Sequence, residues 1–304
     1  MAGRGIALYR GTDQACPYLA GRTAASAFVD PALSLTPAIY ARLLALGFRR
    51  SGSFVYRPLC PDCAECRAVR IPVDAFRPRR SQRRVWRATA PGLDVDPRPA
   101  AFDDQHFALY RRYLAARHPD GEMAGGGADD YCRFLLTDWG ETVCVELRSD
   151  GRLLGVAVTD VVPGALSAVY TFFDPSQQGR SPGVLAILAQ VELARRWNLR
   201  HLYLGYWIAD CRKMRYKSDY RPLEVLVDAA WRRVGPGEPM PGGWPRRSAA
   251  LGDIADILRA RSGPYRRPAQ VVEWHEKTSS RWKGRSPRPF PTPCSASSWR
   301  TATS

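Results

Sequence analysis

The chain of 304 residues is 45% hydrophobic and 24% charged, a composition typical of a globular protein with a hydrophobic core. Its 45 Lys and Arg exceed its 29 Asp and Glu, which gives a net charge of +16 and a pI of about 9.9. No stretch approaches the roughly 20 apolar residues of a membrane span, and the first residues lack the apolar run of a signal peptide. We therefore expect a cytoplasmic protein, without membrane contact and without a disulfide framework.

The positive charge favours a polyanionic partner, since a basic surface releases counterions from nucleic acid. Free use of Arg throughout the chain explains the same surplus, because only Lys213, Lys217, Lys277 and Lys283 are lysines. Charge alone therefore keeps nucleic-acid binding open without establishing it.

The first 80 residues are expected to form a small domain that contains cysteines. Thr36 and Pro37 predict the start of a helix, because Thr is a good N-cap and Pro suits the first helical turn. Gly47 predicts its end, since Gly adopts the left-handed conformation that closes many helices. Further on, the β-rich residues 54–56 and 69–73 predict strands on either side of a cysteine-rich loop.

The loop contains three closely spaced cysteines, Cys60, Cys63 and Cys66, and Cys16 lies upstream. Four thiolates could bind a tetrahedral zinc ion or an iron–sulfur cluster. A set of free, partly buried thiols explains the pattern equally well. Both interpretations stay open, and the reaction considered below requires no cofactor.

Two segments carry few signals of regular structure. A basic run at residues 77–84 and a proline-rich stretch at residues 91–99 together predict a charged connector between two domains. The basic run is equally compatible with a solvated linker or strand edge and with a strip that contacts phosphates. Residues 235–304, rich in Pro, Arg, Ser and Gly, predict a disordered basic tail in which only residues 254–260 are compatible with a short helix.

Residues 102–234 predict a second, mixed α/β (α+β) domain. Phe107, Tyr110 and Leu114 fall on one face of a predicted helix. Three β-rich runs separated by turn signals predict a meander, at residues 142–148, 153–162 and 166–173. A helix centred on 184–191 and a further strand at 199–206 are expected to follow. This order is typical of the acetyltransferase-like fold, although other α+β folds share it.

The residues that follow the last predicted strand are dense in Tyr, Lys and Arg. Lys213 and Lys217 lie four positions apart in a chain that otherwise uses Arg almost everywhere, which indicates a need for a compact ammonium group. Aromatic and cationic side chains in alternation suit a nucleotide, by stacking on bases and pairing with phosphates. A packed aromatic strand with a solvated cationic turn is the alternative interpretation.

A second candidate site precedes the predicted helix of this domain. Tyr170, Asp174, Ser181 and Gly183 are its candidate substrate-binding residues, because N–H groups at a helix N-terminus can hold an anion or a developing oxyanion. Capping and turn formation account for Ser181, Pro182 and Gly183 equally well.

His118, near Asp120 at a predicted helix end, is a further candidate for a general base. A His in such a place is more often a satisfied helix-terminal residue.

Several motifs occur in an order and spacing that identify a family. They are Cys-Pro-Tyr-Leu at 16–19, Gly-Phe-Arg-Arg-Ser-Gly at 47–52, Tyr-Arg-Pro-Leu-Cys at 56–60, Val-Arg-Ile-Pro-Val at 69–73, Tyr-Thr-Phe-Phe-Asp-Pro at 170–175, Leu-Gly-Tyr-Trp-Ile at 204–208 and Lys-Met-Arg-Tyr-Lys at 213–217. Over roughly residues 8–230 the chain closely resembles the bacterial aspartate/glutamate leucyltransferases, which are relatives of the eukaryotic arginyl-tRNA–protein transferases. It departs from them at Pro182, where Leu is usual.

The resemblance implies an N-terminal transferase domain at 1–80 and an acetyltransferase-like C-terminal domain at 102–234. It implies transfer of leucine from leucyl-tRNA to acceptor proteins that begin with Asp or Glu, which marks those proteins for degradation. Leucine rather than arginine as the donated residue rests on the closer likeness to the bacterial branch.

The chemistry that such a transfer needs can be assigned to particular residues. The ester is already activated, and an α-amine with a pKa near 7.7–8.0 is partly neutral in the cell, so the enzyme mainly aligns the reactants and stabilises the oxyanion. We expect Tyr206, Lys213, Tyr216 and Lys217 to contact the terminal adenosine of the tRNA or its phosphates. Bidentate pairing from Arg57 or Arg70 would suit the acceptor carboxylate.

Two other functions remain compatible with the residues. One is an acyl-CoA N-acetyltransferase, although residues 178–183 match a pyrophosphate-binding loop only in part. The other is a non-catalytic, zinc-dependent RNA-binding module, supported by the cysteine run and the basic tail.

Overall fold

The computed structural model of the chain describes residues 6–117, 119 and 125–241. The predictions for His118 and Asp120, for most of the basic tail and for the helix at 254–260 lie outside these residues.

A large mixed sheet forms the centre of the molecule. Its eight strands lie in the order β14-β13-β7-β12-β11-β10-β9-β8. The strands are β7 (Arg67–Pro72), β8 (Leu93–Pro99), β9 (Glu141–Ser149), β10 (Arg152–Val162), β11 (Ala165–Phe173), β12 (His201–Trp207), β13 (Leu223–Val227) and β14 (Ala230–Val234). All neighbours pair antiparallel except β11 and β12, which pair parallel. The predicted meander and the mixed α/β class are confirmed.

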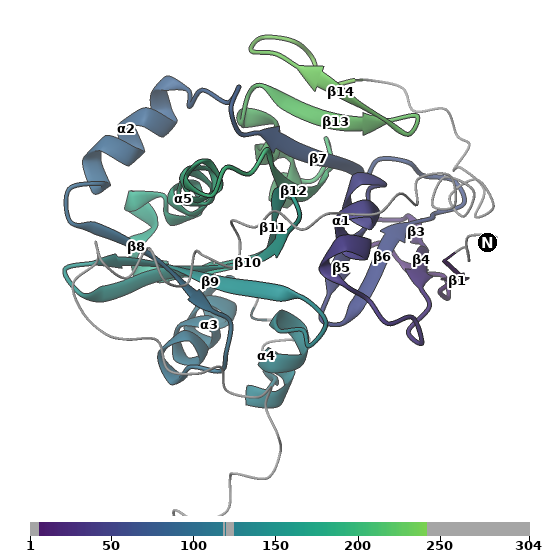
Figure 1. The fold of residues 1–304 in the computed structure, drawn as a ribbon, viewed down its shortest axis with the longest axis horizontal. Coiled ribbons are helices and arrows are strands. Elements are labelled where there is room, and N and C mark those ends of the chain that lie inside the picture. Colours follow the sequence, from purple (N-terminus) through teal and green to yellow (C-terminus); the bar gives the residue numbers. More distant parts are fainter. Residues whose placement is uncertain (1–5, 118, 120–124, 242–304) are drawn as a thin grey trace, which may run out of the picture.

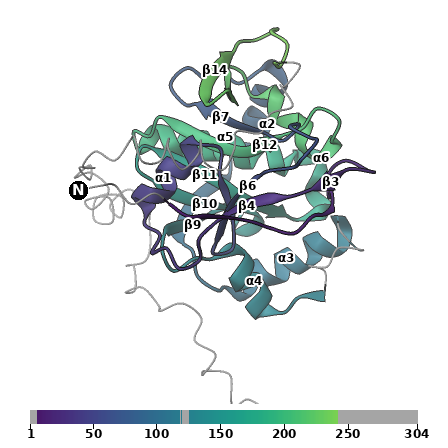
Figure 2. The same ribbon diagram turned by 90° about the vertical axis from the view of Figure 1, so that its right-hand side faces the viewer.

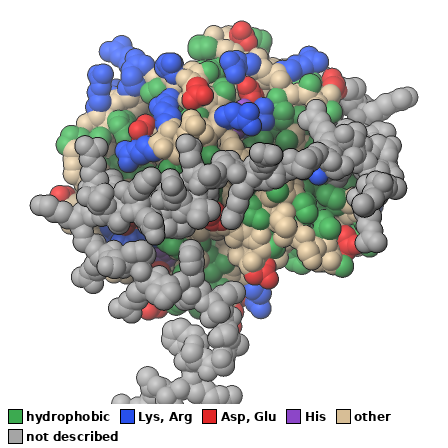
Figure 3. Space-filling view, in the orientation of Figure 1, with side chains coloured by type: hydrophobic (Ala, Val, Ile, Leu, Met, Phe, Trp, Pro, Cys, Tyr) green, Lys and Arg blue, Asp and Glu red, His purple; other side chains and the backbone are tan. Residues whose placement is uncertain are grey.

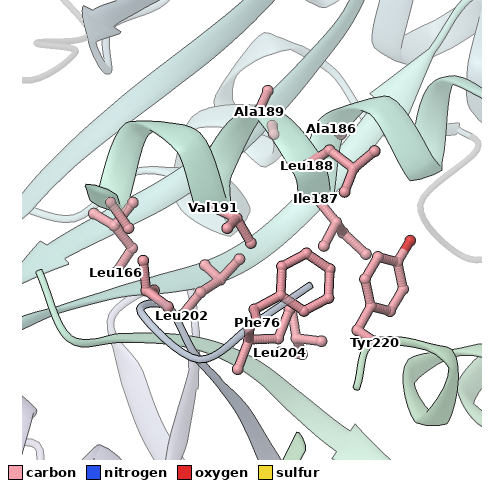
Figure 4. Close-up of a cluster of buried hydrophobic side chains, with 14 of the residues drawn as sticks. Phe76, Leu166, Ala186, Ile187, Leu188, Ala189, Val191, Leu202, Leu204 and Tyr220 are labelled. Atoms are coloured by element: carbon pink, nitrogen blue, oxygen red, sulfur yellow. The ribbon is translucent and has the colours of Figure 1, made fainter. Parts of the chain in front are cut away.

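Helices cover both faces of this sheet (Figure 1). Helices α2 (Arg80–Thr89) and α5 (Pro182–Arg196) lie on one face, and α3 (Asp104–Arg117) and α4 (Ala128–Leu135) on the other. Ile187 and Val191 of α5 pack with Leu166 and Leu202 of the sheet in the main hydrophobic core (Figure 4). None of the described helices is long and apolar enough to cross a membrane.

A smaller sheet with the order β1-β4-β6-β5 stands at one end of the large sheet (Figures 1 and 2). Its strands are β1 (Leu8–Arg10), β4 (Ser26–Val29), β5 (Arg49–Ser51) and β6 (Phe54–Pro58), and β2 (Gln14–Ala15) pairs with β3 (Thr23–Ala24) nearby. Helix α1 (Pro37–Ala45) begins as predicted, because the Thr36 hydroxyl accepts a hydrogen bond from the Ile39 N–H at 3.2 Å. Gly47 follows the helix at a φ of +83°, also as predicted.

The connector predicted at 77–99 is wrong, since the structure has a helix and a strand there. Helix α2 forms because Gln82, Val85 and Trp86 pack inward from it. Strand β8 tolerates its prolines because it is the edge strand of the large sheet, where a missing N–H leaves no ladder partner unsatisfied.

Strand β7 brings the first predicted segment into the large sheet. It comes from the first segment, yet it lies between β12 and β13 of the second segment. Its residues Val69 and Ile71 share a core with Leu185 and Leu223. The predicted boundaries at 80 and 102 therefore do not divide the large sheet into separate parts.

A buried ion pair also links the two sheets. Arg50 of β5 donates to both carboxylate oxygens of Asp160 of β10, at 2.8 and 2.7 Å. Further hydrogen bonds from Arg50 reach the carbonyl of Leu135 and the hydroxyl of Thr142, and Thr142 donates to Asp160. Arg50 and Asp160 are 1% and 3% exposed, so the pair is satisfied without water.

Candidate active site

The two parallel strands of the large sheet pair over a short distance only. The register of β11 and β12 covers Ala165–Ser167 against His201–Tyr203. In the next part of β12 the pairing with β7 is irregular between Tyr203 and Gly205, and Gly205 has a φ of +74°. The lining of the small cavity there includes Gly205, Tyr206 and Arg49, and its volume of about 10 Å³ admits one water-sized group.

Arg49, on β5 of the smaller sheet, extends its side chain to this cavity. Its guanidinium lies 5.9 Å from the ring centres of both Tyr56 and Tyr206. A Cβ atom added at Gly205 would lie 3.6 Å from Nη1 of Arg49. Within the part of the chain that the structure describes, Arg49 has ring contacts but no hydrogen bond or ion pair. A permanent cation is thus available for an anionic group.

Lys217 points into the same place from the 3-10 helix η3 (Tyr216–Asp219). Its side chain is 6% exposed, and Nζ donates to the carbonyl of Tyr206 at 2.6 Å. A Cβ at Gly205 would lie 3.9 Å from Nζ. Burial, and after it the positive charge of Arg49, lower the pKa of Lys217 from 10.5 to about 7. Lys217 can therefore exchange a proton near neutral pH.

The four residues predicted at the tRNA end divide into two pairs. Lys213, on α6 (Arg212–Arg215), is exposed, and Tyr216 is 44% exposed. Tyr206 is 3% exposed and donates its hydroxyl proton to the carbonyl of Gly47 at 2.9 Å. Lys213 and Tyr216 can meet a nucleotide from outside, whereas Tyr206 and Lys217 are buried. Contact of these four residues with the terminal adenosine or its phosphates stays a prediction.

The two arginines predicted for the acceptor carboxylate are occupied by other groups. Arg70 forms an ion pair with Glu224 at 2.8 Å, and its guanidinium lies 4.1 Å from the ring centre of Trp231. Arg57 donates to the carbonyl of Leu46 at 3.2 Å.

Sequence reasoning did not assign Arg49 a role, although it lies in the Gly-Phe-Arg-Arg motif. No local signal distinguishes it in so Arg-rich a chain. Only the fold reveals that it faces Gly205 and Lys217.

Tyr170 and Asp174 have structural roles in this arrangement. Asp174 caps the 3-10 helix η2 (Pro175–Arg180), because its carboxylate accepts from the Ser176 N–H at 3.0 Å. The same carboxylate accepts from Arg152 at 2.7 Å. The Tyr170 ring packs edge-on against Phe134, with ring centres 5.2 Å apart.

Ser181 and Gly183 lie at the start of α5, as predicted. Ser181 has a φ of +53° and makes no side-chain cap hydrogen bond. Pro182 takes the first helical position, which its fixed φ suits. A Cβ at Gly183 would meet only the ring of Phe173, at 3.8 Å. Anion binding by the N–H groups at this helix start stays a prediction.

The four cysteines of the predicted metal site, Cys16, Cys60, Cys63 and Cys66, are free and half-buried. Burial, followed by the neighbouring thiols, raises the pKa of Cys66 to about 12, so its thiol is protonated. Among the described residues, no group of three or more His, Cys, Asp or Glu side chains is arranged to hold a metal ion. The cofactor stays a prediction, and no step below depends on it.

Comparisons with known proteins identify the family of the chain. The family model described as "Arginine-tRNA-protein transferase, N terminus" matches residues 14–84, and its C-terminal counterpart matches residues 105–227. A relative from Alkalilimnicola ehrlichii, named aspartate/glutamate leucyltransferase, is 49% identical over 76% of this chain and 97% of its own length. Relatives of the same name from Hahella chejuensis and Chromobacterium violaceum are 48% and 47% identical, over 75% and 76% of this chain and 97% and 96% of their own lengths. The chain belongs to the aspartate/glutamate leucyltransferase family.

Membership of this family makes the chain an aminoacyltransferase, as its motifs implied. Among solved structures, L-PGS from Bacillus licheniformis aligns with 47% of this chain and 45% of its own, at 13% identity and a TM-score of 0.36. A likeness of that size carries no argument about the site.

Proposed function

We propose that this chain transfers leucine from leucyl-tRNA to proteins whose first residue is Asp or Glu. The name shared by its relatives supports the reaction. The observation that carries its assignment to a site is that Arg49 and Lys217 both approach Gly205.

Arg49, which is partly exposed beside the small cavity, would bind the side-chain carboxylate of the acceptor. A guanidinium recognises a carboxylate through two parallel hydrogen bonds, and Arg49 has no carboxylate partner among the described residues. In an N-terminal Asp the carboxyl carbon and the α-amine are joined through only two carbons. An anchored carboxylate therefore keeps the amine within reach of Lys217.

Lys217 would supply the proton transfer. Its neutral amine accepts a proton from the acceptor's α-ammonium, and the free amine then attacks the carbonyl carbon of the leucyl ester. The attacking nitrogen loses its second proton to water as the C–N bond forms. As the C–O bond to ribose breaks, the protonated Lys217 returns its proton to the leaving ribose oxygen, which becomes a hydroxyl. Because its pKa is about 7, both forms of Lys217 are populated in the cell.

The remaining candidate residues would position the donor. Tyr216 and Lys213 are exposed beside the site and suit the 3′ end of the tRNA, by stacking and by charge. The N–H groups near Ser181 and Gly183 are candidates for stabilising the tetrahedral oxyanion. Degradation of the modified protein and a cytoplasmic location follow from the same proposal.

The test is a transfer assay with the purified full chain. It uses tRNA charged with labelled leucine or, separately, with labelled arginine, and peptides that begin with Asp, Glu or Ala. Leucine transfer to the Asp and Glu peptides alone is expected. Transfer of arginine would overturn the donor, and equal transfer to the Ala peptide would overturn the acceptor.

A further inference from the structure

Helix α2 presents a strongly cationic face that the reaction described above does not use. Arginines occupy positions 77, 79, 80, 83, 84 and 87, and no Asp or Glu lies among them. All six are exposed. Figure 3 shows Lys and Arg gathered over the upper left of that view, where Figure 1 places α2.

These arginines destabilise the helix that carries them. Arg80, Arg83, Arg84 and Arg87 repel one another at spacings of three and four residues. Those nearest the start also oppose the helix dipole, and the first turn contains no acidic residue. A feature that weakens its own element is expected where a partner compensates for it.

Few groups of the protein neutralise this charge. Arg79 pairs with Asp219 at 2.9 Å, and Arg83 donates to the carbonyl of Pro78. In the described part of the chain, Arg80, Arg84 and Arg87 have no hydrogen bond or ion pair. Three guanidinium groups on one helix are thus available for an external anion.

The opposite side of α2 fixes the direction in which these groups point. Gln82 and Thr89 are 3% and 5% exposed, and Val85 and Trp86 pack against the main core. The amide of Gln82 also donates to the carbonyl of Asp219 at 3.3 Å. The cationic face is therefore held outward on a fixed helix.

A groove of about 470 Å³ runs between α2 and α5 and continues this face. Arg83 and Arg87 line it from α2, and Arg195 and Arg196 line it from α5. Trp86 contributes an apolar wall of the groove. Glu192 is the acidic residue in the lining of the groove, and its carboxylate lies 3.7 Å from the guanidinium of Arg195. A track of guanidinium groups beside an aromatic wall matches a phosphodiester backbone.

We propose that α2 and this groove bind the phosphate backbone of the tRNA acceptor stem while its 3′ end occupies the site near Gly205. The proposal rests on the function proposed above. Contacts of Arg79 and Gln82 with Asp219 attach α2 directly to η3, which carries Tyr216 and Lys217. An RNA bound along α2 would therefore lie next to the segment that carries Tyr216 and Lys217.

The experiment compares two double variants of the full chain. Arg84→Ala with Arg87→Ala removes exposed arginines of α2, and Arg111→Ala with Arg112→Ala removes an exposed pair of arginines from α3. Fluorescence anisotropy measures binding of an uncharged acceptor-stem minihelix RNA at several salt concentrations, which requires no catalysis. Thermal unfolding of both variants checks that each is folded.

The α2 variant should bind the minihelix about tenfold or more weakly at 0.1 M salt, with a salt slope reduced by about 1 to 2. The α3 variant should match the parent. Equal affinity and slope for both variants would overturn the proposal, as would binding of the parent to phosphatidylglycerol vesicles without binding to the minihelix. Loss of minihelix binding in the α2 variant, with a parent that transfers no leucine, would uphold the surface and overturn the proposed function alone.

Discussion

At the scale of single residues, Lys217 couples the site to pH. Its pKa is about 7 in the folded chain and 10.5 when exposed, because burial and Arg49 disfavour its charge. Between these values the unfolded chain binds a proton that the folded chain does not, so this residue makes stability rise with pH. The expected slope is about 1.4 kcal/mol per pH unit.

Lys217→Met should remove that contribution. Urea unfolding of the parent and the variant at pH 7.5 and pH 9.5 measures it, because other titrating groups are shared and cancel in the comparison. The stability of the parent relative to the variant should rise between the two pH values. Parallel pH dependences of the two proteins would contradict a lowered pKa.

Gly205 lies beside both cations of the site. Its φ of +74° disfavours a side chain, and an added Cβ would lie 3.6 Å from Arg49 and 3.9 Å from Lys217. Gly205→Ala should cost about 1 kcal/mol of stability. It should also lower the rate of leucine transfer about tenfold, because the methyl group fills space beside both cations that the acceptor would occupy.

Gly151→Ala is the matched control for this change. Its φ of +77° imposes the same strain, but no atom lies within 4 Å of the added Cβ. Stability by urea unfolding should fall similarly in both variants, whereas transfer should fall only at Gly205. Equal transfer rates would show that the space beside Gly205 is not used.

At the scale of elements, the Arg50–Asp160 pair couples β5 to β10. Asp160→Asn leaves a buried guanidinium without its counter-charge, which should destabilise the protein by about 3–5 kcal/mol. Arg233→Met is the control, because its partner Glu224 keeps Arg70, and its own side chain is 58% exposed. The control should cost less than about 1 kcal/mol, and a similar small loss for Asp160→Asn would contradict the coupling.

Some of these elements could be predicted from the sequence and others could not. Helix α1 carries its own signals, namely Thr36, Pro37 and Gly47, and its bounds follow from them. Helix α2 carries arginines and no acidic residue in its first turn, and it is stable because Gln82 and Trp86 pack inward. The inward residues 82, 85, 86 and 89 do follow helical spacing, but two of them are polar. The apolar pattern is therefore weak, and the segment is easily taken for a connector.

At the scale of the whole molecule, the two segments share one sheet and one core. Residues 102–241 alone lack β7, which lies between β12 and β13, and β8 at the far edge. We expect this fragment not to unfold cooperatively, because Val69 and Ile71 leave gaps in the main core. Thermal unfolding followed by circular dichroism tests this, and a sharp transition of the fragment would contradict it.

The site is also a property of the whole molecule, which limits what sequence alone could predict. The segment rich in Tyr and Lys was identifiable by composition, and Lys213 and Tyr216 are exposed there. The meeting of Arg49 with Lys217 depends on the smaller sheet and η3 approaching each other from distant parts of the chain. The partners of Arg57 and Arg70, the carbonyl of Leu46 and the carboxylate of Glu224, likewise depend on the fold and leave no signal in the sequence.

The most direct test of the account is the acceptor preference of an Arg49→Gln variant. The measurement is kcat/KM for leucine transfer to matched peptides that begin with Asp or with Asn, in the parent, in Arg49→Gln and in Arg57→Gln. The parent and Arg57→Gln should favour Asp. Arg49→Gln should lose about a hundredfold of that preference, because the bound carboxylate would lack its counter-charge. An unchanged preference in a folded Arg49→Gln variant would contradict the assignment of the site.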